Sequence, residues 1–438
     1  ENPSNEGRLC VKGRFGFSFV NSPDRLKTPL IRRNGTLEEA TWDEALDLVA
    51  ERFSAARGDA FAAIASAKLT NEENYVIQKF SRAVMGTNNV DHCARLCHSP
   101  SVAGLVQSFG SGAMTSSSKD LGDARCTLAI GTNTTAAHPI IGLQVMRSIR
   151  AGGKLIVVNP REIELARYAD LYIQNRAGSD VALLMGMMRV IVDEGLHDPE
   201  FIEARCENLE AFRDSLAEFD AASVEEKTGV PFELIAEAAR MYAQNSPAAI
   251  LYAMGITQHT HGTDNVLATS NLAMLTGNVG LPSGGVNPLR GQSNVQGACD
   301  MGALPNVYPG YQKVDLPEVK AKFEKAWGVE LDDAPGLTHL EILAGVTAGP
   351  IRAIYLVGEN PALSEADATH AREAMEKVDF LVVQDIFLTE SAEYADVVLP
   401  AASFAEKDGT FTNTERRVQR VRKAIPPVGD SRDDAWIT

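Results

Sequence analysis

A cysteine and a histidine stand side by side at Cys97 and His98, in a segment that reads DHCARLCHSP from Asp91 to Pro100. A thiolate is a soft metal ligand and a nucleophile, and an imidazole exchanges protons near neutral pH. The pair could therefore join a metal ligand to a proton carrier. Taken alone, it is more often a buried, inert cysteine beside a loop histidine, so its interpretation depends on the rest of the chain.

A second candidate lies in the segment 284–302, GGVNPLRGQSNVQGACDMG. Its glycines let a backbone approach a ligand closely, and its amides and Arg290 supply directional donors. An arginine in such a segment can grip a small carboxylate at two points. The alternative, a solvated loop arginine, is less favoured because the segment is so polar and so rich in glycine.

Near the start of the chain, Cys10 is followed two residues later by Lys12 in the segment GRLCVKGR. A single cysteine there is ordinarily structural. It gains meaning only from the other candidates.

Composition narrows the class of protein. The 438 residues carry a net charge of −17, with 45% hydrophobic and 23% charged residues. This is typical of a globular protein of two or three domains, and the negative charge argues against a nucleic-acid binder. No apolar run approaches the length of a membrane span. Six cysteines in this length do not indicate a disulfide framework, which favours a reducing compartment.

The elements that position these candidates include a repeat. The segments 126–173 and 351–399 both read as a strand, a Gly-x-Asn loop, a helix, a second strand, a polar loop and a short strand after Tyr-Ala-Asp. Their apolar β-branched runs predict parallel strands buried on both faces. Ligands of such sheets bind beyond the carboxyl ends of the strands. No Gly-x-Gly-x-x-Gly follows either first strand, which disfavours NAD. The repeat predicts two similar nucleotide-bearing ligands, with a ligand-free duplication as the alternative.

Amphipathic patterns predict helices over 43–53, with Thr41 as N-cap, and over 181–194 and 231–244. Between 254 and 313 the periodicity fades and Gly, Asn, Gln and Thr dominate. This pattern predicts a loop region lining a site.

Together these residues resemble the molybdenum- or tungsten-bis(pyranopterin guanine dinucleotide) oxidoreductases, and most closely the catalytic (alpha) subunits of formate dehydrogenases with a cysteine metal ligand. The resemblance spans the chain, and its specific stretches are RLCVKGRF at 8–15, CARLCHSPSV at 93–102, AMLTGN at 273–278 and RGQSNVQGACDMG at 290–302. It implies an α/β fold of two doubly wound, Rossmann-like domains related by a pseudo-twofold duplication, plus the remnant of a small iron–sulfur domain. The implied boundaries are 1–45 for that remnant and a linker, 46–92 with 293–404 for one α/β domain, 93–292 for the other, and 405–438 for a return to the iron–sulfur region.

The resemblance also implies roles for single residues. Cys97 matches the molybdenum or tungsten ligand, His98 the proton carrier and Arg290 the residue that orients formate. Lys12 matches the lysine between a [4Fe–4S] cluster and a pterin, and Cys10 matches one of the four cluster cysteines.

Further residues are expected to bind the two molybdopterin guanine dinucleotides, with the carboxylates of Asp180 and Asp385 as partners of the guanine edges. The expected set is Gly131, Thr132, Asn133, Asn159, Pro160, Arg161, Gly178, Asp180, Met254, Gly255, Gln258, Gly291, Gln292, Gly358, Glu359, Asn360, Gln384, Asp385 and Thr389.

The other three cluster cysteines and a C-terminal domain of the family have no counterpart here, so the sequence is expected to be an inactive fragment of a larger enzyme. The expected partners are formate or CO2 and an electron-transfer subunit, ferredoxin or NAD-linked partner. A cytoplasmic location is expected, with a periplasmic one as the alternative. The alternative functions are a nitrate reductase of the same superfamily, a cofactor-free structural subunit of a respiratory complex, and a plain nucleotide-binding module.

Overall fold

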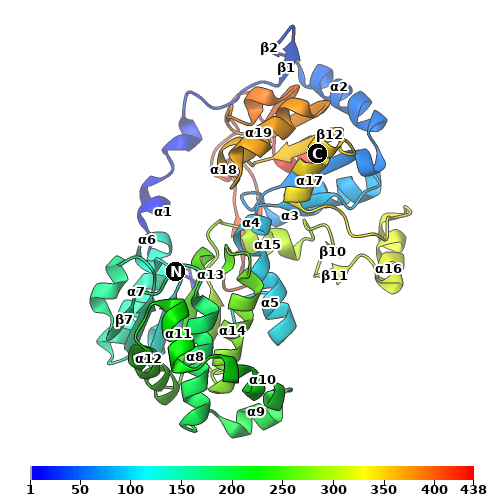
Figure 1. Ribbon diagram of the computed structural model, residues 1–438. Helices are drawn as coiled ribbons and strands as arrows, with labels where there is room; N and C mark the ends of the chain where they lie inside the picture. Colours follow the sequence, from blue (N-terminus) through cyan, green and yellow to red (C-terminus); the bar gives the residue numbers. More distant parts are fainter. Residues whose placement is uncertain (1) are drawn as a thin grey trace. The chain divides into compact units, whose positions relative to one another are not determined.

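The computed structural model describes residues 2–438, which divide into two compact units (Figure 1). Unit 1 holds the residues up to Arg14, Leu96–Gly291 and Thr414–Arg416, and unit 2 holds Phe15–Arg95, Gln292–Asn413 and Arg417–Thr438. Each unit is therefore built from separate stretches of the chain. Most residues of the expected segments 1–45 and 405–438 belong to unit 2.

Unit 1 is built on a parallel five-stranded sheet in the order β7-β6-β5-β8-β9. The strands are β5 (Cys126–Ile130), β6 (Lys154–Val158), β7 (Leu171–Ile173), β8 (Ala248–Tyr252) and β9 (Gly285–Pro288). The chain runs outward from β5 in one direction and returns through β8 on its other side. The order of the strands therefore reverses between β5 and β8, which is where ligands of such sheets bind.

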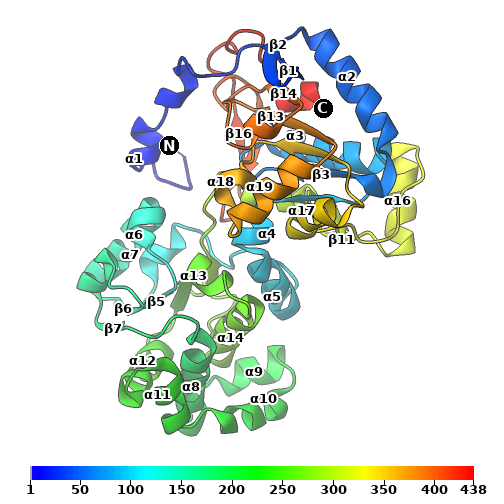
Figure 2. The same cartoon turned by 45° about the horizontal axis from the view of Figure 1, so that its top comes forward.

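Alternate side chains of these strands point to opposite faces. Leu128 and Ile130 of β5 share a core with α5 (Ser99–Phe109), α8 (Asp180–Asp193), α12 (Phe232–Gln244) and α14 (Gly262–Leu275). Ala129 points into the opposite core, against α7 (Pro139–Arg150). Figure 2 shows α8 and α12 packed together with α11 (Ala221–Thr228). The remaining helices of this unit are α6 (Thr134–Ala137), α9 (Pro199–Arg205), α10 (Leu209–Ser215) and α13 (Met254–Thr257).

Unit 2 contains a seven-stranded sheet in the order β2-β1-β14-β13-β12-β3-β4. The strands are β1 (Leu30–Arg33), β2 (Thr36–Glu39), β3 (Phe61–Ala65), β4 (Val90–His92), β12 (Ala353–Val357), β13 (Phe380–Asp385) and β14 (Val397–Pro400). From β14 to β4 the strands are parallel, and β1 and β2 add an antiparallel edge. The strand order reverses between β12 and β3.

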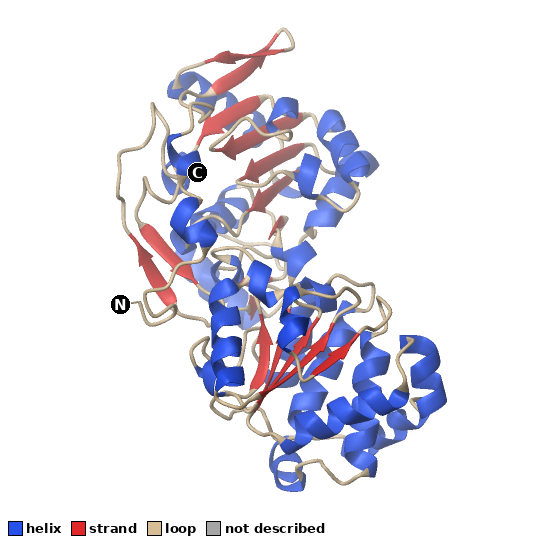
Figure 3. Ribbon diagram, turned by 90° about the vertical axis from the view of Figure 1, so that its left-hand side faces the viewer, coloured by secondary structure: helices blue, strands red, loops and turns tan. Residues whose placement is uncertain are grey.

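Helices cover both faces of this sheet, as Figure 3 shows. One face packs against α2 (Trp42–Ala55), α3 (Asn71–Lys79) and α20 (Asp434–Ile437), and the other against α17 (His339–Ala348), α18 (Pro361–Ser364) and α19 (Ala368–Lys377). The other elements of unit 2 are α15 (Val295–Asp300), α16 (Pro317–Trp327) and the two-stranded sheets of β10 (Val307–Tyr308) with β11 (Gln312–Lys313) and β15 (Gly409–Thr412) with β16 (Val418–Val421). Two short helices, α1 (Val11–Phe15) and α4 (Ala94–Cys97), lie at unit boundaries.

The predicted repeat has the same element order in both units. After β5 the chain forms α6, α7, β6, a 3₁₀ turn (Glu164–Tyr168) and β7, and after β12 it forms α18, α19, β13, a 3₁₀ turn (Ala392–Tyr394) and β14. In each copy the first strand pairs in parallel with the second, and the second with the third. The two copies therefore share one strand–helix–strand plan.

The predicted N-cap of α2 is present: Thr41 Oγ1 accepts the N–H of Glu44, whose carboxylate accepts the N–H of Thr41. The loop expected over 254–313 is wrong in part, because α14 is a regular helix of 14 residues. Its small and polar residues, such as Asn265, Thr269 and Ser270, are buried together with its apolar ones. A helix buried on most sides carries no amphipathic period, so periodicity could not reveal it.

Within residues 2–438, no helix combines the length and apolar character needed to cross a membrane.

Candidate active site

Cys97 and His98 lie where one short helix ends and the next begins. α4 ends at Cys97, and His98 is the N-cap of α5, whose first turn contains Pro100. A proline is tolerated there because the first helical N–H groups need no intrahelical partner. Cys97 is partly exposed, whereas His98 is fully buried. The local sequence thus places a partly exposed cysteine directly before an enclosed imidazole.

A chain of hydrogen bonds fixes the ring of His98. Its Nε2 lies 3.2 Å from the carbonyl oxygen of Leu289, which can only accept, so Nε2 carries the hydrogen. Its Nδ1 lies 2.9 Å from Ser101 Oγ and therefore accepts the serine hydroxyl. The hydroxyl of Tyr252, buried at the end of β8, donates to Ser101 Oγ at 3.0 Å. His98 is thus a neutral Nε2–H tautomer.

Arg290 follows directly on the end of β9, and the backbone around it is held by side chains. Its N–H donates to Thr414 Oγ1 at 3.2 Å, and Thr414 Oγ1 donates to the carbonyl of Pro288 at 3.1 Å. His138 Nε2 lies 2.8 Å from the carbonyl oxygen of Arg290. The guanidinium is buried and donates through Nη2 to the carbonyl of Gly112 at 2.6 Å.

Burial and one cation set the electrostatics of this cluster. Burial raises the pKa of the Cys97 thiol, and the positive charge of Arg290 partly offsets this. Burial, reinforced by Arg290, holds the pKa of His98 well below its usual range, and burial also lowers the pKa of His138. Arg290 lies nearly 200 residues beyond Cys97 and His98 in the sequence, yet its charge acts on the pKa of both groups within unit 1.

Cys10 directly precedes α1, and Lys12 is the second residue of that helix. The pKa of the Cys10 thiol is lowered, chiefly by the backbone N–H of Gly13. Lys12 Nζ donates to the carbonyl of Ala137 at 3.2 Å, one residue before His138. The predicted iron–sulfur and pterin-side residues therefore reach the same unit as the Cys97 cluster.

The expected dinucleotide residues of unit 1 gather at the switch point between β5 and β8. Gly131 and Gly255 are in backbone contact: Gly255 N–H donates to Gly131 O at 3.0 Å, and a Cβ on Gly131 would lie 2.7 Å from the carbonyl carbon of Gly255. Only glycines fit this approach. Met254 is exposed beside them, and Gln258 donates to the carbonyl of Leu96. Thr132 and Asn133 follow Gly131 toward α6.

The remaining residues of this set lie on the loops after β6 and β7. Asn159, Pro160 and the exposed Arg161 follow β6, and Asn159 Oδ1 accepts the N–H of Arg161 in a local turn. Gly178 lines a cavity of about 420 Å³. Asp180 begins α8, is buried, and has a pKa raised by that burial.

In unit 2 the matching switch point lies between β12 and β3. Gly358 follows β12, and Ser66, which follows β3, donates to its carbonyl at 3.0 Å. Lys68 Nζ donates to the same carbonyl and reaches Glu359 Oε2 at 3.3 Å. Asp385 lies at the end of β13 and is partly buried. Desolvation of its carboxylate raises its pKa to about 6.

The side chains of three expected residues of unit 2 form hydrogen bonds within the protein. Gln384 is fully buried, donates to Asp434 at 2.6 Å and accepts the hydroxyl of Tyr355. Asn360 holds the loop after β13 through Ser391, and Thr389 accepts a backbone N–H of the same loop. Their side chains stabilise the edge of the sheet.

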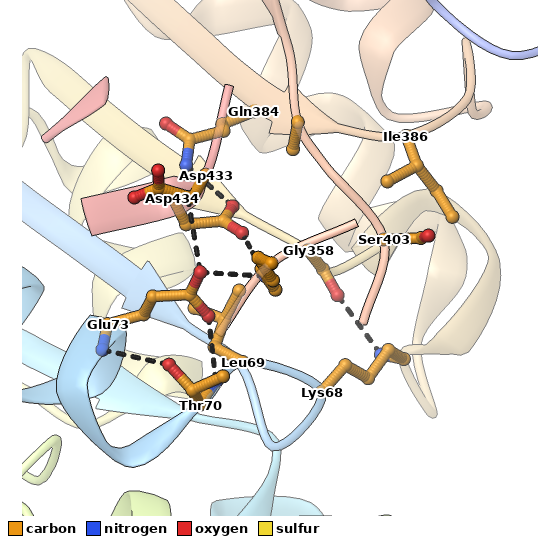
Figure 4. A network of polar contacts seen from close by, with 12 residues as sticks. Lys68, Leu69, Thr70, Glu73, Gly358, Gln384, Ile386, Ser403, Asp433 and Asp434 are labelled. Atoms are coloured by element: carbon orange, nitrogen blue, oxygen red, sulfur yellow. Dashed lines mark hydrogen bonds and ion pairs between the residues drawn. The ribbon is translucent and has the colours of Figure 1, made fainter. Parts of the chain in front are cut away.

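Figure 4 shows the network that Gln384 joins, in which Glu73 and Asp434 lie next to each other and the N–H of Asp434 donates to Glu73 Oε1 at 3.2 Å. Lys407 Nζ lies 2.8 Å from Glu73 Oε1 and 2.5 Å from Asp434 Oδ2. All three side chains are nearly fully buried. One ammonium thus stands between two buried carboxylates.

Buried acceptors near both switch points are compatible with a ligand that carries N–H groups. Within residues 2–438, Glu359 Oε1 and His138 Nδ1 are buried without a hydrogen-bond partner. Unpaired buried acceptors cost free energy unless a donor reaches them. Pterin and guanine rings carry N–H donors, so the residues fit a pterin guanine dinucleotide.

Sequence reasoning missed several residues of the site: Ser66, Lys68, Ser101, His138, Tyr252 and Thr414. Of these, only the position of His138 could be predicted to lie at a helix boundary, because it precedes Pro139 and a residue before proline disfavours the helical conformation. Gln292 of the expected set lies in unit 2, where its Oε1 accepts the thiol of Cys93 at 3.1 Å, and Gly291 is exposed.

Comparisons with known proteins give consistent matches. A family model described as molybdopterin oxidoreductase matches residues 25–438. The chain is 51% identical over 430 residues to the F420-dependent formate dehydrogenase 1 subunit alpha of Methanococcus maripaludis, covering 98% of this chain and 63% of that protein. It is 47% identical over 446 residues to formate dehydrogenase H of Escherichia coli, covering 99% of this chain and 62% of that protein.

Among solved structures, acetylene hydratase from Pelobacter acetylenicus matches with a TM-score of 0.83 at 23% identity, over 100% of this chain and 64% of that one. At this identity the likeness establishes the fold alone. The chain spans less than two thirds of the length of each of these three proteins.

Proposed function

The chain belongs to the molybdopterin oxidoreductase family, and we propose that it is the part of a formate dehydrogenase that oxidises formate to CO2, or runs the reverse reaction. Oxidation of HCOO⁻ yields CO2, one proton and two electrons. The site therefore has to hold a small carboxylate, receive the electrons and remove the proton. The relatives named as formate dehydrogenases support formate as the substrate.

The cofactor would be molybdenum or tungsten with two molybdopterin guanine dinucleotides, and when bound it supplies the acceptor of the two electrons. Cys97 would be its protein ligand, since a thiolate suits a sulfur-rich metal site. The glycines at the two switch points, with Asp180, Asp385 and Glu359, would hold the dinucleotides.

The observation that carries the proposal is the shared placement of Arg290, His98 and Cys97. Arg290 emerges from a backbone that is hydrogen-bonded on both sides, so its guanidinium is held ready to orient a formate carboxylate. Its charge also lowers the cost of a thiolate at Cys97. A planar cation and a soft ligand thus share one small region.

His98 would take the proton at Nδ1, because Nε2–H is already donated to Leu289. Ser101 makes this feasible: its hydroxyl donates to a neutral Nδ1, and its oxygen accepts from a protonated one. Electrons would leave past Lys12 to a [4Fe–4S] cluster that includes Cys10.

Arg290→Lys in the full, cofactor-loaded protein tests the proposal. An ammonium cannot reproduce a planar two-point grip, so kcat/KM for formate should fall by the equivalent of about 1.5–3 kcal/mol, roughly 10- to 150-fold. The metal content should not change, since Arg290 is not a ligand. His370→Gln, a partly exposed histidine of α19, is the control. Unchanged formate kinetics in Arg290→Lys would count against the assignment.

A further inference from the structure

The backbone from Pro288 to Arg290 leaves the sheet with every polar group paired. The N–H of Leu289 still donates to the carbonyl of Tyr252 at 2.8 Å, as in the ladder between β8 and β9. Beyond that point side chains replace strand partners, and the carbonyls of residues 288, 289 and 290 accept in turn from Thr414, His98 and His138. Buried backbone groups require such partners.

We propose that His138 is a positioning residue of the site: its imidazole fixes the carbonyl of Arg290 and so sets the direction in which the Arg290 side chain leaves the backbone. The inference rests on the proposed function, because it concerns the residue assigned to formate. The role proposed here belongs to Nε2 of His138, which holds the Arg290 carbonyl and does not touch the substrate. It acts through Arg290.

The geometry makes this hydrogen bond a strong constraint. His138 Nε2 lies 2.8 Å from the carbonyl oxygen, a normal N–H···O distance, and a carbonyl can only accept. The ring must therefore be the Nε2–H tautomer. With Arg290 N–H held by Thr414, the peptide groups on both sides of the Arg290 Cα are anchored. Rotation about its backbone dihedrals is thereby restricted.

The local sequence also fixes His138. It stands between Ala137, the last residue of α6, and Pro139, the first of α7. A residue before proline is held away from the helical region, and His138 has φ −131° and ψ 60°. Its N–H donates to Thr134 O, while Lys12 Nζ donates to Ala137 O. The backbone that carries the imidazole is thus held in place.

Charge reinforces the neutral state of the ring. Burial lowers the pKa of His138, the hydrogen bond to the Arg290 carbonyl partly offsets this, and the nearby ammonium of Lys12 adds to the lowering. The net shift favours the neutral ring, in which Nε2–H is donated to the Arg290 carbonyl and Nδ1 is an acceptor.

The test compares His138→Leu with His138→Gln in the full, cofactor-loaded protein. Leucine removes the donor, and glutamine retains an N–H that can reach a carbonyl. For His138→Leu we expect KM for formate to rise by roughly 3- to 10-fold, the effect of one lost hydrogen bond, with a smaller change in kcat. His138→Gln should restore most of the affinity. His370→Gln is the matched control, since this histidine lies on α19 of unit 2.

A second readout does not depend on turnover. With ¹⁵N-histidine labelling, the ring nitrogens of His138, assigned from the spectrum of His138→Gln, should show the neutral Nε2–H tautomer throughout pH 6–8. Absence of formate oxidation by the loaded wild type would defeat the proposed function while this spectrum still tests the His138–Arg290 bond. An Nδ1–H tautomer or an imidazolium at neutral pH would overturn the inference. So would an unchanged KM in His138→Leu, or a KM in His138→Gln as high as in His138→Leu.

Discussion

At the scale of single residues, two thiols of unit 1 have opposite environments. Cys10 accepts the N–H of Gly13, which stabilises its thiolate and lowers its pKa. Cys97 loses more through desolvation than it gains from the cation of Arg290, so its pKa is raised. A metal at Cys97 would therefore have to displace a proton, and its binding should weaken as the pH falls.

This difference predicts an order of reactivity in the protein freed of metal and cluster. Because the thiolate is the nucleophile, iodoacetamide should modify Cys10 at a lower pH than Cys97, as followed by mass spectrometry of peptides across pH 6–10. Cys206, whose pKa is raised by burial alone, is the reference. In Arg290→Met, the modification of Cys97 should require a still higher pH, because the cation that favours its thiolate is lost. Modification of Cys97 before Cys10 would contradict the electrostatic account.

Residue types and spacing, with the family resemblance, predict a role for Cys97, His98 and Arg290. They could not identify Ser101, Thr414 or His138, because these side chains matter only through tertiary hydrogen bonds to one segment of backbone. Nor could they show that Gln384 and Asn360 serve the protein's own structure.

At the scale of elements, α2 and α3 begin with the same capping box but in different surroundings. Glu44 in α2 is exposed, and hydrogen bonding to Thr41 lowers its pKa. Glu73 in α3 is buried beside Asp434, and its pKa is raised from 4.5 to about 7. Lys407 sets one positive charge against the two buried carboxylates, so the ionised form of Glu73 is disfavoured.

The raised pKa of Glu73 predicts a loss of stability with rising pH. Its contribution is fully present below pH 4.5, where the carboxyl is protonated in both states, and is lost as the pH rises to about 7. Glu73→Gln removes this dependence, so the variant should gain about 1–3 kcal/mol relative to wild type over that interval. Urea unfolding at a series of pH values measures it.

Glu44→Gln is the matched control, because it changes the same position of the other capping box. The pKa of Glu44 is shifted in the opposite direction, so the stability that it contributes is present above its unfolded pKa and is lost as the pH falls. A stability difference between Glu73→Gln and wild type that does not change with pH would refute the account of the buried network.

At the scale of the whole molecule, each copy of the sequence repeat forms part of the switch point of its own unit. In one unit the backbones of Gly131 and Gly255 meet, and in the other the Ser66 hydroxyl donates to the carbonyl of Gly358, so in each unit the glycine after the first strand of the repeat contacts the neighbouring strand's loop. The strands of the repeat were predictable because buried parallel strands leave continuous apolar runs. The helix α14 was not, since its burial on most sides hides its period. The pairing of β1 with β14 joins residues more than 360 positions apart, which no local pattern reveals.

The most direct test of the central claim is formate-dependent dye reduction by the full, cofactor-loaded protein, with molybdenum and tungsten quantified in the same samples. We predict that the wild type oxidises formate, that Cys97→Ala loses this activity because the metal loses its protein ligand, and that Cys206→Ala retains it. A metal-loaded wild type inert toward formate, or a Cys97→Ala protein that oxidises formate at the wild-type rate, would contradict the account.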